Sequence, residues 1–151
     1  MRIEDEIKQP TFRNVFQKAY INLAFTANWL QMQAAQTFKN YDLTLPQFNV
    51  LRILRGQHPN PATVNLIIER MLDKTSNASR IVDKLVAKGW VTRTQCEHDR
   101  RTVDVLITEE GLNLLKRIDE CEQTLNAHMG MQHLSESEAE QLNQILDKIR
   151  G

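Results

Sequence analysis

The stretch from residue 73 to residue 111 constrains the fold most, because a helical pattern runs directly into two short β-patterned segments. Asp73 is a good N-cap, Gly89 ends the pattern, and apolar residues recur at helical spacing in between, at Ala78, Ile81, Val82 and Leu85. Residues 91–95 and 103–107 then read as two short strands. The sequence therefore predicts a helix over about 74–88 and then an antiparallel hairpin.

The charge distribution marks this helix and hairpin as a basic surface. The whole chain of 151 residues has a formal net charge of zero at pH 7. Residues 74–101, however, carry seven basic and three acidic side chains, whereas residues 104–147 carry two basic and ten acidic ones. A local basic surface on a neutral chain is typical of a segment that binds nucleic acid.

Two shorter helices are predicted before this segment. Thr44 can cap a helix with Gln47 at the capping-box position, and Gly56 is expected to end it. A short helix over about 63–71 then leads through a tight connection into the helix at 74–88. Short helix, turn, second helix and hairpin is the order of a winged helix-turn-helix.

Polar side chains gather near the start of the second of these helices. The N-terminal residues of that helix meet base edges in a helix-turn-helix, and Asn and Arg suit adenine and guanine edges. Lys88 is expected further along, near the DNA backbone. The alternative is a capped, solvated helix, because Ser, Thr and Asn are common in first turns. The predicted DNA contacts here are Thr75, Ser76, Asn77, Ser79, Arg80 and Lys84.

The loop between the two predicted strands, residues 96–102, contains Asp99, Arg100 and Arg101. An Asp in a tight loop can hold an Arg side chain in place, and a fixed guanidinium suits the narrow, negative minor groove. These three residues are therefore predicted DNA contacts as well. The alternative is an ordinary charged β-turn, and charge composition does not separate the two.

Long helices are predicted on both sides of the DNA-binding segment. Residues 11–40 hold apolar side chains at three- and four-residue steps without a Gly or Pro, and Thr108 and Ser135 cap two later helices. These apolar stripes exceed what one small core can bury, so we expect a homodimer. The predicted layout is a single domain over 1–151, with dimerisation helices at about 11–40 and 109–150 and a DNA-binding part at about 43–108.

Other classes of protein leave no signal in the sequence. The N-terminus lacks the apolar core of a signal peptide, and no apolar run approaches the roughly 18 residues that span a bilayer. Two cysteines fit a reducing compartment, so we expect a cytoplasmic protein without a membrane partner. With no phosphate loop or nucleophile elbow, an enzyme is not expected, nor is any catalytic residue, cofactor or metal. The nearest metal-like set, with spacing unsuited to a helical site, is Cys121, Glu122, His128 and His133.

The run LDKTSNASRIVDKLVAKGWVTR, followed by HDRRTVDVLITEEG, resembles the MarR family of winged helix-turn-helix transcriptional regulators. The matching features are the D-K-S/T-x-x-S-R-x-V-D-x-L helix, the K-G-W/L-V-x-R exit, the D-x-R wing motif and L-T/I-T-E-x-G at the next helix. LTLPQFNVLRIL is similar to the family's second helix. PATVNLIIERM departs from the family's S-x-x-E-L-A-x-x-L pattern.

The resemblance implies a mainly α fold with a small β-hairpin wing and a homodimer joined through its N- and C-terminal helices. Each subunit would place the recognition helix, about 74–88, in the major groove and the wing, about 96–102, in the minor groove. The target would be one half of a pseudo-palindromic operator in double-stranded DNA. Many members are repressors released by small aromatic compounds, oxidants or metals, so a ligand-responsive repressor is implied.

The remaining candidates concern sensing and an alternative function. Phe16, Tyr20, Trp29 and Phe48 are a hypothetical pocket for a small aromatic effector, and core packing is the alternative use of each. Cys96 lies beside an acidic residue that disfavours a thiolate, and Cys121 is expected to be packed. The alternative function is a winged-helix module that binds protein and has lost DNA binding. That interpretation predicts a neutral or acidic outer face, which the net charge of +4 over residues 74–101 argues against.

Overall fold

The computed structural model of the protein describes residues 1–95, 103–120 and 131–151, and residues 96–102 and 121–130 lie outside the description. In agreement with the sequence, the fold is mainly helical with one small antiparallel sheet. The elements in chain order are α1 (Ile3–Glu6), α2 (Val15–Lys39), α3 (Leu45–Gln57), β1 (Ala62–Thr63), α4 (Val64–Arg70), α5 (Ala78–Ala87), β2 (Val91–Gln95), β3 (Val103–Ile107), α6 (Glu109–Glu120), the 3-10 turn η1 (Met131–His133) and α8 (Glu136–Arg150).

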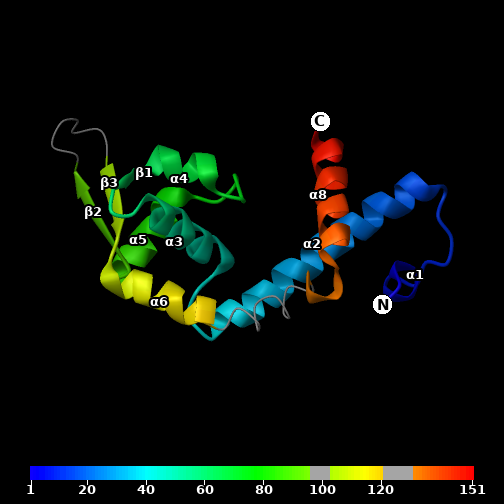
Figure 1. The fold of residues 1–151 in the computed structure, drawn as a ribbon, viewed down its shortest axis with the longest axis horizontal. Helices are drawn as coiled ribbons and strands as arrows, with labels where there is room; N and C mark the ends of the chain where they lie inside the picture. Colours follow the sequence, from blue (N-terminus) through cyan, green and yellow to red (C-terminus); the bar gives the residue numbers. More distant parts are fainter. Residues whose placement is uncertain (96–102, 121–130) are drawn as a thin grey trace.

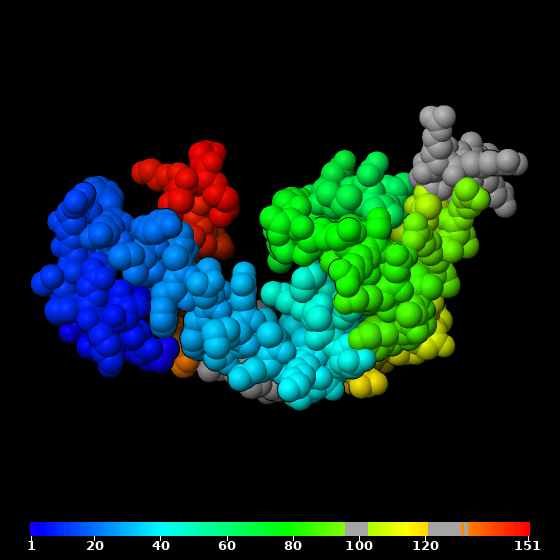
Figure 2. All heavy atoms as spheres, turned by 180° about the vertical axis from the view of Figure 1, so that it is seen from behind, coloured from blue at the N-terminus to red at the C-terminus, as the bar shows by residue number. Residues whose placement is uncertain are grey.

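These elements form two parts that α2 connects. In Figure 1, α3, α4, α5 and the sheet lie at one end, whereas α1, α8 and both chain termini lie at the other. Figure 2 shows the same two lobes from behind, with a hollow between them that opens away from α2. α6, which belongs to the segment 109–150 expected to form dimerisation helices, lies with α3 and α5 in the first part, whereas α8 lies in the second.

The sheet contains the predicted hairpin and one further strand. β2 and β3 have the predicted bounds and pair antiparallel, from Val91 opposite Ile107 to Gln95 opposite Val103. β1 pairs with the other edge of β3, where Ala62 lies opposite Val105. Periodicity did not predict β1, because two residues are too few to show the alternation of a strand. The central strand β3 is therefore held on both sides.

The core lies where α3, α4, α5, α6 and the sheet meet. Leu51, Ile67, Leu85 and Leu115, one from each helix, are all fully buried. The predicted capping box at the start of α3 is confirmed: Thr44 and Gln47 bond each other reciprocally, at 3.4 and 3.0 Å. α3 continues through the residue predicted to end it, Gly56, because the N–H of His58 still bonds the carbonyl of Leu54 at 3.0 Å.

Helix α5 begins later than the sequence predicted. The expected cap was Asp73, but the first helical residue is Ala78 and the cap is Asn77, whose side chain accepts the N–H of Arg80 at 3.0 Å. Asp, Asn, Ser and Thr favour both helix caps and turns, so the local sequence offered two equivalent starts. Ile81, predicted to face inward, is half-buried and lies at the edge of the core.

The two long outer helices are largely uncovered. α2 begins at Val15 rather than residue 11, capped by Asn14, and among its residues Ala34, Thr37 and Phe38 at the C-terminal end are buried. Phe16 and Tyr20 in its N-terminal half are 80% and 73% exposed. Within α8, which the structure describes in full, no residue is buried. A single chain therefore leaves the apolar stripes of both helices facing solvent.

Helix α6 begins as predicted and packs closely on the residue that precedes β2. The Thr108 hydroxyl donates to the Gly89 carbonyl at 2.8 Å and accepts the N–H of Gly111 at 3.1 Å, which fixes the first turn of α6. A Cβ atom at Gly111 would lie 2.4 Å from the carbonyl oxygen of Trp90. The backbone approach of α6 to the end of the α5–β2 connection therefore requires glycine at this position.

We predict opposite effects of two glycine-to-alanine changes. Gly111→Ala should lower the free energy of unfolding by about 1–3 kcal/mol, because the added methyl group overlaps a backbone oxygen that cannot move independently. Gly56→Ala, inside α3 with nothing within 4 Å of the added atom, should raise stability by about 0.5–1 kcal/mol. Urea unfolding of both variants measures the difference. Equal stability of Gly111→Ala and the wild type would contradict the close approach.

Candidate nucleic-acid interface

Helix α5 presents one buried face and one exposed face. Ala78, Val82 and Leu85 are buried against the core, whereas Ser79 and Arg80 in the first turn are exposed. With the other described residues, the side chains of Ser79 and Arg80 form neither hydrogen bonds nor ion pairs, so their polar groups remain available to a ligand. Both residues were predicted DNA contacts, and the structure places them together at the exposed start of the helix.

The turn before α5 uses the other predicted contacts internally. The carboxylate of Asp73 accepts the backbone N–H of Thr75 at 2.9 Å, its hydroxyl at 2.6 Å, and the hydroxyl of Ser76 at 2.6 Å. The Ser76 and Thr75 hydrogen bonds lower the pKa of Asp73 to about 2, so this carboxylate is ionised at neutral pH. Thr75, Ser76 and the helix cap Asn77 therefore shape the turn, and only their remaining lone pairs and protons face outward.

The two lysines further along α5 differ in their surroundings. Lys84 is exposed, and its side chain forms no hydrogen bond or ion pair with another residue that the structure describes. Lys88, expected near the DNA backbone, instead forms an ion pair with Asp42 at 2.8 Å, bonds the backbone carbonyl of the same residue, and lies 4.9 Å from the centre of the Trp90 ring. The end of α5 is therefore fastened to the loop between α2 and α3.

A second ion pair connects the hairpin to α5. Arg93 on β2 bonds Asp83 on α5 at 2.5 Å, and both side chains are substantially exposed. An exposed pair of this kind contributes little to the stability of the fold. The candidate contacts Asp99, Arg100 and Arg101 lie outside the described residues, between the paired strand ends Gln95 and Val103.

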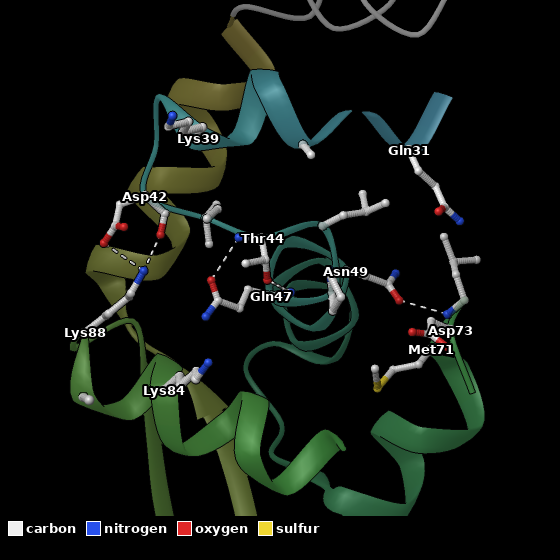
Figure 3. Close-up of a pocket in the computed structure, with 16 residues that line it drawn as sticks. Gln31, Lys39, Asp42, Thr44, Gln47, Asn49, Met71, Asp73, Lys84 and Lys88 are labelled. Carbon is white, nitrogen blue, oxygen red and sulfur yellow. Dashed lines mark hydrogen bonds and ion pairs between the residues drawn. The ribbon is translucent and has the colours of Figure 1, made fainter. Parts of the chain in front are cut away.

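A hollow of about 1180 Å³ lies between α2 and the helix-turn-helix. Figure 3 shows its polar lining: Gln31 and Lys39 come from α2, Lys84 and Lys88 from α5, and Asp73 from the turn. Leu43, Leu45, Leu72 and Ala87 add apolar surface. The hollow therefore touches the long helix α2, the C-terminal end of α5 and the turn that precedes α5.

The four aromatic residues proposed for an effector pocket do not line this hollow. Phe16 and Tyr20 are exposed on the N-terminal half of α2, and Trp29 borders a smaller hollow beside α1. Phe48 stacks on Phe38, with ring centres 4.2 Å apart, at the base of the core. Helical periodicity placed three of them on α2. It could not show that the larger hollow lies at the C-terminal end of this helix, away from these three residues.

The described residues form neither a metal-binding cluster nor a membrane-spanning helix. Across the described residues, no three His, Cys, Asp or Glu side chains are grouped to hold a metal ion. Cys96, Cys121, Glu122 and His128 lie outside the description, so that only His133 of the set considered from the sequence has a place in the structure. No helix in the described ranges is both long and apolar enough to cross a bilayer.

The order α4, turn, α5, β2 and β3, with an exposed polar helix start beside a hairpin, defines a winged helix-turn-helix protein. A model of the MarR family matches residues 41–102, a range that contains α4, the turn, α5 and β2 and ends directly before β3. The transcriptional regulator PecS of Dickeya dadantii is 29% identical over 115 residues, which cover 76% of this chain and 69% of PecS.

Solved structures agree over nearly the whole length of the chain. A MarR transcription factor from Planctomyces limnophilus has a TM-score of 0.70 and 29% identity, and the match covers 91% of this chain and 98% of that one. The MepR–DNA complex of S. aureus has a TM-score of 0.68 and 25% identity, with coverages of 87% and 94%. The chain is thus similar to the MarR family over residues 41–102, and its fold is that of MarR-family transcriptional regulators.

Proposed function

We propose that the protein is a transcriptional regulator that binds specific sequences in double-stranded DNA as a homodimer. The observation that carries this proposal is the exposed first turn of α5, where the side chains of Ser79 and Arg80 have no partner among the described residues. The related MepR was solved as a complex with DNA, which supports the same partner here. Because DNA is the proposed partner, we place its action in the cytoplasm, by binding rather than by catalysis.

In the proposed complex, α5 enters the major groove and the loop at 96–102 reaches the adjacent minor groove. The guanidinium of Arg80 can bond the O6 and N7 atoms of guanine together, and Ser79 is one residue away on the same exposed turn. Lys84 lies one turn further along, within reach of a phosphate. Asp99, Arg100 and Arg101 are proposed for the minor groove. The alternative, a protein-binding module, does not require free hydrogen-bonding groups at the start of α5.

We predict that DNA binding is salt-dependent and depends on two arginines. If a dimer neutralises roughly six to eight phosphates, the slope of log K against log salt should be about −5 to −7.

Arg80→Ala and Arg101→Ala should each weaken binding to a selected duplex by about 1–3 kcal/mol per contact. Asp99→Ala should weaken it less, because it acts through the orientation of the arginine. Fluorescence titrations of the wild type and the three variants at several salt concentrations measure the slope and the affinities.

The control for this experiment is Arg150→Ala, in the last turn of α8 at the opposite end of the molecule (Figure 1). It removes the same charge without touching the proposed interface, so its affinity should match that of the wild type. Wild-type affinity in Arg101→Ala would remove the minor-groove role of the loop. Wild-type affinity in Arg80→Ala would remove the assignment of the major-groove contact.

The proposal of a homodimer rests on the uncovered faces of α2 and α8. Large apolar side chains are exposed on both helices, among them Phe16 and Tyr20 on α2 and Ile145 and Ile149 on α8, the latter two 57% and 63% exposed. Burying one such side chain completely is worth about 1.5–3 kcal/mol. A second copy related by a twofold axis covers the same face on both subunits, which matches a pseudo-palindromic DNA site.

We predict that the wild-type protein sediments as a dimer at micromolar concentration. Ile145→Glu should shift it toward monomer, because a carboxylate would be buried in the apolar contact. Ile68→Glu, on an exposed face of α4 outside the proposed contact, is the matched control and should remain dimeric. Sedimentation velocity distinguishes the species. A wild-type monomer under these conditions would be incompatible with the proposed interface.

We further propose that the protein is a repressor and that a small aromatic acid releases it from DNA by binding in the hollow between α2 and α5. Lys39 and Lys84 supply positive charge on opposite walls, and neither ammonium group is bonded to another described residue. The leucines of the lining suit an aromatic ring. Because Lys84 is also a proposed phosphate contact, an anion held there would compete with the DNA backbone.

We predict that benzoate weakens binding to a selected duplex about fivefold or more at saturation, which is the lower range of allosteric coupling. Benzyl alcohol, which has the ring but no charge, should have no comparable effect. Lys39→Met should abolish the response to benzoate while leaving DNA affinity in its absence unchanged, because Lys39 lies on α2 away from the proposed interface. The same fluorescence titration measures both. Equal effects of benzoate and benzyl alcohol would rule out the lysines as ligands.

A further inference from the structure

The turn between α4 and α5, residues 71–77, is held by side chains on three sides. From α3, the Asn49 side chain accepts the backbone N–H of Leu72 at 3.0 Å (Figure 3). Within the turn, Asp73 bonds Thr75 and Ser76 as described above. From the turn back to α4, the ammonium of Lys74 donates to the carbonyl of Ile68 at 3.0 Å and to that of Glu69.

The contacts of Lys74 have a clear physical basis. The last carbonyls of a helix have no partner within that helix, and they also carry the negative end of the helix dipole. The Lys74 ammonium satisfies two of them at the C-terminal end of α4. With two of its three protons directed at α4, this ammonium points back into the helix-turn-helix instead of outward as a free charge.

We propose that Lys74 is a positioning residue, which together with Asn49 and Asp73 sets the angle between α4 and α5 and so presents Ser79 and Arg80 to the bases. The proposal rests on the DNA-binding function proposed above. Lys74 belongs to the basic segment that suggested nucleic-acid binding, so the simpler assignment is a phosphate contact. The structure assigns it a different role, in which its charge serves α4 and its effect on DNA passes through the orientation of α5.

The two roles predict different losses when Lys74 is replaced. A phosphate contact is insensitive to sequence, so its loss weakens binding to all duplexes equally and lowers the salt slope by about 0.9 per lysine, about 2 for a dimer. A lost positioning contact leaves the phosphate contacts in place. It lowers the ratio between affinities for a selected and a scrambled duplex, because base contacts depend on the exact placement of α5.

The test compares Lys74→Met with Lys116→Met, where Lys116 is an exposed lysine on α6 whose side chain forms no bond with another described residue. The probes are a duplex of about 30 base pairs, selected from a random pool by the wild-type protein, and its scrambled counterpart. Each is titrated over a range of salt concentrations. Hydrogen exchange of the backbone amides from Leu72 to Arg80 is followed without DNA, where a phosphate contact has no influence.

For Lys74→Met we expect a selectivity ratio that falls about five- to tenfold, an unchanged salt slope, and faster exchange in the turn. Lys116→Met should match the wild type in all three. Asn49→Leu, which removes an uncharged tie to the same turn, should repeat the loss of selectivity and the faster exchange. Agreement between a charged and an uncharged residue separates positioning from electrostatics.

A salt slope that falls by about 2 with an unchanged ratio and unchanged exchange would overturn the proposal in favour of a phosphate contact. Wild-type behaviour of Lys74→Met in all three measurements would also overturn it. If the wild-type protein selected no duplex, the proposed DNA-binding function would fail. The exchange data would still decide whether Lys74 fixes the turn, so the two failures are distinguishable.

Discussion

Burial of one face of α5 is the constraint on which the rest of the structure depends. Val82 and Leu85 are fully buried against α3, β2 and the rest of the core. A helix of ten residues that buries one face must present the other, and Ser79 and Arg80 lie on that other face. The same packing brings Asp83 beside Arg93 and so places the hairpin next to the exposed helix face. The candidate interface is thus a consequence of how the core is filled.

The start of α5 shows how side chains that look like contacts can be structural. Three polar residues directly precede the first turn of α5, and the sequence predicted them as DNA contacts: Thr75, Ser76 and Asn77. In the structure, however, the side chains of Thr75 and Ser76 bond Asp73, and that of Asn77 caps the helix. A turn built from such short polar side chains fixes its backbone with little buried apolar surface. Rigidity at this point matters because the two exposed residues of α5 follow within one helical turn. A binding surface of this kind needs more polar residues than those that touch the ligand.

Much of the fold was predictable from the sequence where the determining interactions are local. The capping boxes at Thr44 and Ser135, the cap at Thr108 and the bounds of β2 and β3 follow from neighbouring residues, and the structure confirms them. The predicted start of α5 was wrong by several residues. Asp73 and Asn77 are both good helix caps, and the helix begins at the buried residue Ala78, directly after Asn77. β1 depends on its partner β3, more than forty residues away, and the hollow depends on which end of α2 meets the core. Such contacts between distant segments leave no periodic signal in the chain.

The length of α2 links the proposed DNA binding of the protein to its proposed dimerisation. Its C-terminal end is built into the DNA-binding lobe through Ala34 and Phe38, and its N-terminal half carries the uncovered face of the proposed dimer. At 1.5 Å per residue, its 25 residues span roughly 38 Å, comparable to one turn of the DNA helix. A tilt of about 5° at one end of such a rigid helix moves the other end by roughly 3 Å. Because the hollow lies between α2 and α5, a ligand that bound there as proposed and changed the angle between the two helices would act near the C-terminal end of α2. The recognition helices of the proposed dimer would then lose their spacing without any change in the residues that read the bases.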